Sequence, residues 1–167
     1  MAKLMVVGPM VVGVDGSADS LGALSTAAEL AGESGVELVV VHVRHENGIV
    51  AANSALAGAG VALDEALDEV ERMSRERAAD VLAGRRVPWR FEVAFGDPAT
   101  ELIAAAGRQR ATTIVVGGRT HGVVGGLVMG SVAQKLIRHS PVSVLVVRDG
   151  RADHLDMTPR GDVLNLH

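Results

Sequence analysis

Residues 114–147 constrain the fold of this chain more strongly than any other stretch. The stretch begins and ends with an apolar run that is typical of a buried strand. Between these runs lie six glycines, the first at Gly117 and the last at Gly130, and then a short helical pattern that ends at Pro141. Two buried strands joined through a helix form a parallel crossover. Because ligands of open α/β sheets bind beyond the carboxyl ends of the strands, we expect a ligand at the glycine-rich loop.

Strand and helix patterns alternate along the rest of the chain. The predicted strands lie at residues 10–14, 36–43, 87–95, 112–116 and 142–147. All are apolar runs except residues 87–95, where apolar and polar side chains alternate as they do at a sheet edge. Helical patterns separate the strands, so we predict an α/β fold in which helices sandwich a five-stranded parallel sheet.

The helical patterns make predictions about particular residues. Asp19 or Ser20 is expected to cap the first helix, and Asp97 is expected to cap the helix that begins at Pro98. The helix over residues 63–83 is expected to bury an apolar stripe and to expose a charged face. That stripe consists of Leu63, Leu67, Val70, Met73 and Val81.

The length of the chain indicates how many domains it forms, and its net charge indicates which partners it can bind. At 167 residues it is expected to form one domain, residues 1–148, followed by a flexible tail at residues 149–167. Residues 46–60 are rich in alanine and glycine and are expected to form a mobile loop. A net charge of −4 and an aromatic content of 2% argue against nucleic-acid binding.

Several features point to a cytoplasmic location. The chain has no cysteine, which excludes disulfide bonds and thiolate zinc sites and is compatible with a reducing compartment. No apolar run approaches the ~18 residues of a membrane span, so we expect no membrane partner. Gly8 and Pro9 interrupt the apolar N-terminus, which therefore predicts a strand rather than a signal peptide.

The glycine-rich loop has the chemistry of an anion site. Backbone N–H groups at a helix start point outward without partners, and the helix dipole adds partial positive charge, so phosphates bind there. The Ser131 hydroxyl could donate to a phosphate oxygen, or it could cap the helix. Arg119 and His121 are further candidates for phosphate contacts. Asp15 could bind a ligand, or it could accept hydrogen bonds within its own DGS turn.

Motifs for other chemistry are missing from the sequence. It contains neither a P-loop with a GK[ST] ending nor a G-x-G-x-x-G after the first strand. His42 and His45 are three residues apart on a predicted strand, which points their rings to opposite faces and argues against a metal pair. No Ser, His and Asp set and no general base for hydrolysis can be identified. We therefore predict no catalytic residue and no metal ligand.

Taken together, these segments resemble the universal stress protein family. The resemblance covers residues 10–148 and rests on VGVDGS, VVVHV, GDPATELIAAA, and GGRTHGVVGGLVMGS followed by VAQKLIRHSPVSVLVVR. It implies a doubly wound sheet of the adenine nucleotide α-hydrolase-like kind. Many members bind ATP through a signature of glycine, two residues, glycine, nine residues, glycine and Ser or Thr. Other members lack the signature and do not bind ATP.

The resemblance assigns the phosphate end of a nucleotide to this loop. Gly130 and Ser131 match the end of the signature, and Gly117 matches its first glycine. The second glycine is replaced by Thr120. If that position needs φ above zero, a β-branched residue would be strained by roughly 1–2 kcal/mol or the loop would take another path. Gly122 could then serve in its place.

The resemblance also implies an adenine end. Asp15 matches an aspartate that lies at the adenine, where its carboxylate can accept from the purine amino group. Val43 matches a residue whose backbone meets the base, and Val116 would line the pocket. Arg119 and Thr120 complete the predicted nucleotide-binding residues.

Two functions remain open on this basis, because the missing catalytic groups weaken a third, an ATP-dependent enzyme such as a ligase or kinase. The first is a stress-response sensor or regulator that binds ATP, or ADP or AMP, with a divalent metal such as Mg²⁺ accompanying the nucleotide. It would hydrolyse ATP slowly at most, and binding would order the glycine-rich loop. The second is a dimeric interaction protein of the same fold that has lost nucleotide binding, with Thr120 as the sign of that loss.

The resemblance implies a homodimer through the last strand, which begins at Val142 and ends at Val147. An apolar strand left open at a sheet edge would be liable to uncontrolled pairing, so a partner strand is expected there. A further protein partner is expected for either function.

Overall fold

The computed structural model describes residues 6–45, 60–118 and 129–148. The strands are β1 (Met10–Gly13), β2 (Leu38–Arg44), β3 (Trp89–Phe95), β4 (Thr113–Gly117) and β5 (Ser143–Val147). The helices are α1 (Ala18–Ser34), α3 (Gly60–Leu82), α4 (Pro98–Gln109) and α5 (Ser131–His139). Each predicted strand is present, and its ends are shifted by at most two residues.

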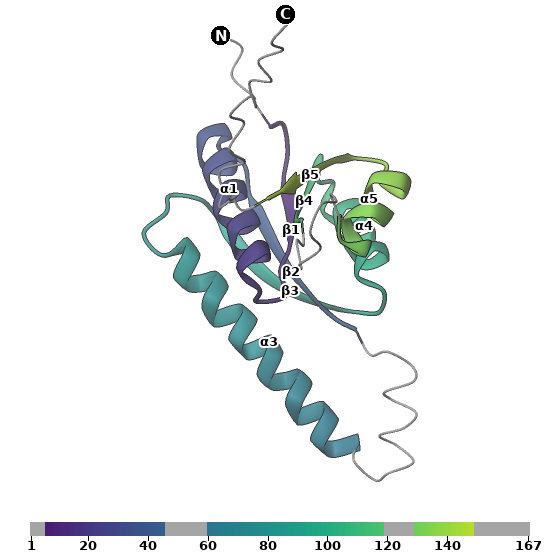
Figure 1. The fold of residues 1–167 in the computed structure, drawn as a ribbon. Helices are drawn as coiled ribbons and strands as arrows, with labels where there is room; N and C mark the ends of the chain where they lie inside the picture. The colour runs from purple at the N-terminus through teal and green to yellow at the C-terminus, as the bar shows by residue number, and fades with distance from the viewer. Residues whose placement is uncertain (1–5, 46–59, 119–128, 149–167) are drawn as a thin grey trace, which may run out of the picture.

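The strands form one five-stranded sheet in the order β3-β2-β1-β4-β5, and all neighbours are parallel (Figure 1). Val12 of the central strand β1 pairs with Val40 of β2 on one side and with Val115 of β4 on the other. The chain therefore adds strands in one direction up to β3 and then returns to the other side of β1. The predicted α/β class and the doubly wound parallel sheet are confirmed.

Helices cover both faces of the sheet and bury two apolar layers. The layer on the α1 and α3 side contains Met10, Val12, Leu24, Val40 and Val115, among others. The layer on the α4 and α5 side contains Val11, Val39, Leu102, Ile114 and Leu136, among others. Since alternate residues of each strand point to opposite faces, the unbroken apolar runs of the sequence fill both layers. No helix in the described part of the chain combines the length and the apolar character needed to cross a membrane.

The start of α1 differs from the prediction. Ser17, and neither Asp19 nor Ser20, is the N-cap, because its hydroxyl accepts from the Ser20 N–H at 3.3 Å. Ser20 is instead buried, with its own hydroxyl donating to the Ser17 carbonyl at 3.0 Å. The helix ends at Gly35, whose φ of 69° gives the left-handed conformation usual after a helix.

The predicted apolar stripe of α3 is wrong in part. Val70 and Met73 are exposed, and the buried residues of the helix are Ser74, Ala78 and Leu82. The second half of α3 carries these buried contacts, whereas its first half projects beyond the sheet (Figure 1) and reaches β2 through Asp68, which accepts from Arg44 Nη1 at 2.6 Å. Small residues such as Ser74 and Ala78 allow the helix axis to approach the body closely, so the buried face follows them rather than the larger apolar side chains.

The predicted cap of α4 is confirmed and also joins two helices. Asp97 Oδ2 accepts from the Thr100 N–H at 3.1 Å, and Asp97 Oδ1 accepts from Lys135 Nζ of α5 at 2.7 Å. The Lys135 ammonium, together with the Thr100 N–H, lowers the pKa of Asp97 to about 2. The charged form of Asp97 is therefore favoured in the folded protein.

We expect a pH-dependent contribution of Asp97 to stability. Because the pKa of Asp97 is lowered on folding, the contribution is complete above about pH 4, the usual range of an unfolded aspartate, and is lost as the pH falls toward 2. Asp97→Asn keeps a capping side chain but cannot ionise. Urea unfolding should therefore show a difference in free energy between wild type and Asp97→Asn at pH 6 that shrinks between pH 4 and pH 2. An equal difference at pH 6 and pH 2.5 would contradict this assignment.

Candidate functional site

The candidate site lies between β1 and β4, where the order in which the chain adds strands to the sheet reverses. After β1 the chain turns into α1 on one face, and after β4 it leads towards α5 on the other. Loops that diverge from adjacent parallel strands leave a crevice at the carboxyl ends, which is where open α/β sheets bind their ligands. The loop 14–17 and the end of β4 lie at this point of the sheet.

Asp15 follows β1 and is held in a defined orientation. Its Oδ1 accepts from the Ser17 N–H at 3.0 Å and from Ser17 Oγ at 2.5 Å. The Asp15 N–H donates to Ser20 Oγ at 3.3 Å. The predicted role as acceptor within the DGS turn is thus present. Since the residue is also exposed, its carboxylate can meet a ligand without losing that turn.

Val43 presents its backbone beside Asp15. The Val41 carbonyl accepts from the Val14 N–H at 2.9 Å, so alternate residues of β2, including Val43, direct their N–H and C=O groups to the β1 side. The Val14 carbonyl that would continue the ladder bonds the ring Nδ1 of His42 at 3.0 Å. β1 ends here, and the backbone groups of Val43 face the space that it leaves.

Val116 and Gly117 form the end of β4, and both have structural roles. Val116 is buried in the layer beneath α4 and α5, so its side chain adds little accessible surface to the site. A Cβ on Gly117 would lie 2.6 Å from the carbonyl carbon of Asp19 and 2.7 Å from its oxygen. Glycine at position 117 is therefore explained by the close approach of α1, with or without a ligand.

The start of α5 has the features of an anion site. Gly130 is the N-cap and provides no side-chain capping bond, and the first helical bond joins its carbonyl to the Gln134 N–H at 3.0 Å. The N–H groups of the first turn have no partners within the helix. The Ser131 side chain is exposed at the first helical position, so the alternative role of Ser131 as the N-cap is wrong.

Two of the predicted site residues lie outside the described residues, namely Arg119 and Thr120. His121 and Gly122, the other loop residues discussed above, lie there as well. The predicted site residues within the described ranges lie at the ends of β1, β2 and β4 and at the start of α5. The core layer on the α4 and α5 side runs beneath both the strand ends and the start of α5. Val43 of β2, Val116 of β4 and Met129, which precedes α5, all pack in that layer.

Sequence reasoning missed three residues that shape the site. His42 is buried, and its ring bonds the Val14 carbonyl. The sequence signal for this bond was a polar residue inside an apolar run, because a buried polar group needs a hydrogen-bond partner. Met129 had no signal beyond its position before α5. Arg77 Nη1 donates to the Gly16 carbonyl at 2.7 Å, yet in the sequence it is one of many charges on α3.

His42 of β2 and His45, which follows this strand, each bond a backbone carbonyl. His42 bonds Val14, whereas His45 Nδ1 lies 2.9 Å from the carbonyl oxygen of Gly96. Within residues 6–45, 60–118 and 129–148, no group of three or more His, Asp or Glu side chains is arranged to hold a metal ion.

Comparisons with known proteins agree on one family. The sequence model of the Universal stress protein family matches residues 7–148. Universal stress protein YxiE of Bacillus subtilis is 32% identical over 146 residues, which cover 83% of this chain and 97% of that protein. The solved structure of hypothetical protein MJ0577 has a TM-score of 0.73 at 20% identity and covers 89% of this chain and 100% of its own. A universal stress protein in complex with cAMP has a TM-score of 0.59 at 24% identity, covering 86% and 98%.

The contact between Gly117 and α1 makes a prediction about stability. Gly117→Ala would force the Asp19 backbone to move, and we expect it to lower the free energy of unfolding by about 1–3 kcal/mol. Gly22→Ala is the matched control, because a Cβ at this position of α1 meets no atom within 4 Å and alanine favours a helix. Urea unfolding of both variants measures the contrast. Equal stability of the two variants would show that α1 does not approach β4 as described.

Proposed function

The chain belongs to the universal stress protein family, and we propose that it binds an adenine nucleotide, ATP in the first place, at the carboxyl ends of β1 and β4. In this proposal it acts as a sensor or regulator in the stress response of the cytoplasm. The observation that carries the proposal is that the oriented Asp15 carboxylate follows the end of β1, and that the N–H and C=O groups of Val43 in the neighbouring strand are directed to the β1 side. Together they offer the acceptors and the donor that match the edge of an adenine ring.

The phosphates would bind at the start of α5. The start of α5, where Gly130 provides no side-chain cap, offers backbone N–H groups and the positive end of the helix dipole, and Ser131 adds an exposed hydroxyl. Lys135, one turn further along α5, bonds Asp97 instead and is directed to α4. Mg²⁺ would accompany the nucleotide through its phosphate oxygens.

A neighbour of similar fold was solved with cAMP, which is itself an adenine nucleotide. ADP and AMP are therefore included in the proposal beside ATP. Because we identify no general base among the described residues of the site, we propose binding with slow hydrolysis at most.

A charge change at Gly130 tests the phosphate end without disturbing the helix. Aspartate is a favoured N-cap and the φ of −58° at Gly130 suits any residue, so Gly130→Asp should fold well. Its carboxylate would repel the phosphates, and we expect ATP affinity to fall by more than about tenfold. Gly130→Ser is the matched neutral control and should retain binding.

Isothermal titration with ATP, together with native mass spectrometry of freshly purified protein, measures these affinities. Retained ATP that is lost in Gly130→Asp would support the proposal. No binding by the wild type at millimolar ATP would instead favour the second function, a dimeric interaction protein without nucleotide, in which Thr120 marks the loss of the signature.

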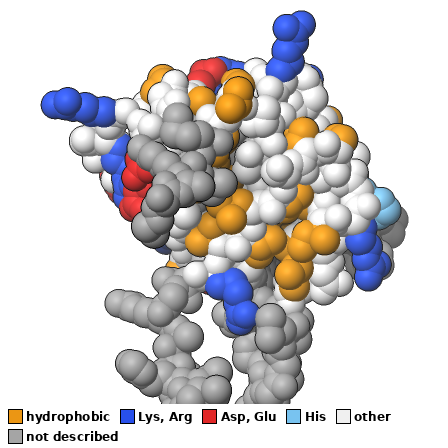
Figure 2. All heavy atoms as spheres, turned by 90° about the horizontal axis from the view of Figure 1, so that it is seen from above, with side chains coloured by type: hydrophobic (Ala, Val, Ile, Leu, Met, Phe, Trp, Pro, Cys, Tyr) orange, Lys and Arg blue, Asp and Glu red, His pale blue; other side chains and the backbone are white. Residues whose placement is uncertain are grey.

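We also propose a homodimer through β5, the edge strand of the sheet. Val144, Leu145 and Val146 of this strand are only partly buried although they are apolar. β5 lies at the upper edge in Figure 1, and the view onto that edge in Figure 2 shows hydrophobic side chains gathered across it. The opposite edge differs, because Arg90 of β3 bonds Glu37, Glu92 and Gln109. Charges of this kind discourage edge pairing, whereas an apolar edge favours it.

A lysine on β5 tests this interface. We expect wild-type protein to be dimeric at micromolar concentration and Val144→Lys to be monomeric, because two lysines would be brought together across the interface. Val93→Lys places the same charge on the other edge strand and should leave the dimer intact. Sedimentation velocity distinguishes the states. A wild-type monomer, or a dimer that Val144→Lys leaves unchanged, would refute the assignment.

A further inference from the structure

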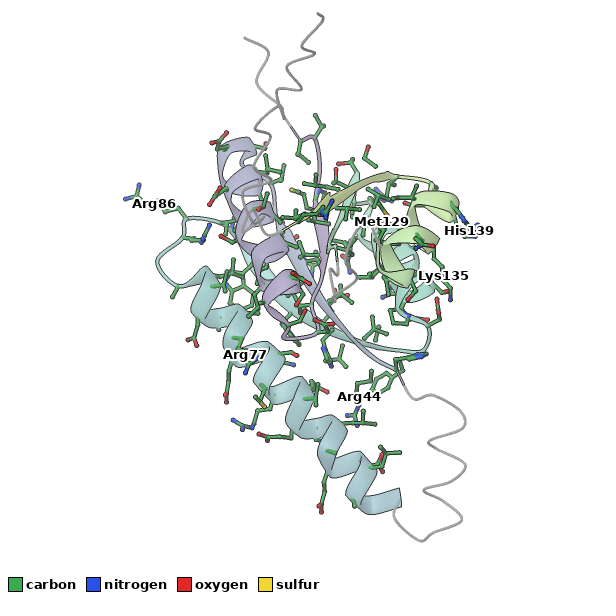
Figure 3. All side chains as sticks on the ribbon, viewed as in Figure 1. Arg44, Arg77, Arg86, Met129, Lys135 and His139 are labelled. Carbon is green, nitrogen blue, oxygen red and sulfur yellow. The ribbon has the colours of Figure 1, made fainter. Side chains whose placement is uncertain are left out.

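Arg77 connects α3 to the loop that carries Asp15. Its guanidinium Nη1 donates to the Gly16 carbonyl at 2.7 Å, across 61 positions of sequence. Figure 3 labels Arg77 on α3, where this helix passes the lower end of α1 in that view. The bonds of Asp15 to Ser17 and Ser20 join the loop to itself and to α1, whereas Arg77 joins it to a separate helix.

The loop is also pressed closely against α3 at this point. Gly16 is buried and has a φ of 78°, a conformation that favours glycine. A Cβ on Gly16 would lie 3.1 Å from Ser74 Oγ, and Ser74 is itself only 1% exposed. The Gly16 carbonyl is therefore held at a packed contact rather than in open solvent.

One peptide unit links Arg77 to the Asp15 carboxylate. The carbonyl of Gly16 accepts from Arg77, and the N–H of the same peptide plane, that of Ser17, donates to Asp15 Oδ1 at 3.0 Å. Because the peptide is planar, fixing its carbonyl also fixes the direction of its N–H. A charged donor on the carbonyl further polarises the N–H and strengthens its bond to the carboxylate.

We infer that Arg77 is a positioning residue for the adenine end of the site. Through the peptide between Gly16 and Ser17, it sets the orientation in which Asp15 meets the amino group of the base. The inference rests on the proposed function only where it takes the bound base to be adenine. The orientation of the Ser17 N–H by Arg77 does not depend on any ligand.

The surroundings of Arg77 allow it to be removed without undocking α3. Arg85, just beyond the helix, donates to Ser25 Oγ of α1 at 2.8 Å and to the Ser25 carbonyl at 3.2 Å. Ala78 and Leu82 are buried against the body. These contacts remain in Arg77→Ala, so the variant should keep its fold.

Arg72 of the same helix provides a matched control. Its guanidinium bonds Glu69 and Glu76, both of which are exposed on α3 itself. Arg72→Ala therefore removes the same charge from the same helix without touching the loop. Arg77→Lys keeps a cationic donor and should restore part of the effect.

The first measurement compares ATP with ITP, which carries a carbonyl in place of the purine amino group. Wild type should prefer ATP because a carboxylate accepts from the amino group and repels the carbonyl. In Arg77→Ala, we expect ATP affinity to fall roughly tenfold while ITP affinity stays unchanged. Arg72→Ala should behave as wild type, and Arg77→Lys should lie between. Unchanged ATP affinity in Arg77→Ala, or an equal loss for both nucleotides, would overturn the inference.

The second measurement separates this inference from the proposed function. Amide hydrogen exchange of the ligand-free protein reports the bond from the Ser17 N–H to Asp15. Exchange at Ser17 should accelerate in Arg77→Ala and not in Arg72→Ala. If the wild type binds neither nucleotide, the proposed function fails, but faster exchange at Ser17 still supports the positioning role. Unchanged exchange in Arg77→Ala would overturn that role, whatever the binding result.

Discussion

The close approach of α1 to β4 is the constraint on which the site depends. Only a glycine fits at position 117, because the Asp19 backbone occupies the place of a side chain. This contact brings the start of α1 beside the end of β4, at the point where the order of the strands in the sheet reverses. The loop between β1 and α1 is thereby confined between the sheet and α3, where Arg77 reaches it. A short loop held from several sides loses little further entropy when a ligand binds.

The two ends of the proposed nucleotide site use different physical means. At the adenine end, a series of hydrogen bonds from Arg77 through one peptide to Asp15 fixes a charged acceptor. At the phosphate end, attraction comes from backbone N–H groups and the dipole of α5, so a lysine is not required. The ion pair of Asp97 with Lys135 ties α5 to α4 and helps to hold the start of α5 in place. In this proposal, the adenine end would select the base, whereas the phosphate end would supply the general affinity for an anion.

The sequence predicts those parts of the structure that depend on local pattern. Apolar runs located four strands, an alternating pattern located β3, and Asp97 before Pro98 located the start of α4, because burial and capping act over a few residues. The buried face of α3 was missed, since helix packing selected the small residues Ser74 and Ala78 over the larger Val70 and Met73. Arg77 was indistinguishable from its solvated neighbours because its partner, the Gly16 carbonyl, is 61 positions away. The roles of Arg119 and Thr120 remain predictions, because they lie outside the described residues.

The central claim is that one nucleotide spans from the loop after β1 to the start of α5. Titration of ¹⁵N-labelled protein with ATP and Mg²⁺, followed by amide chemical shifts, tests it directly. Amides of Ser17, Val43 and Ser131 should all shift along the titration and give a single dissociation constant, while exposed amides of the projecting half of α3 stay in place. The claim would be contradicted if these amides remained unshifted at saturating ATP, or if the shifts at Ser17 and Ser131 followed separate dissociation constants.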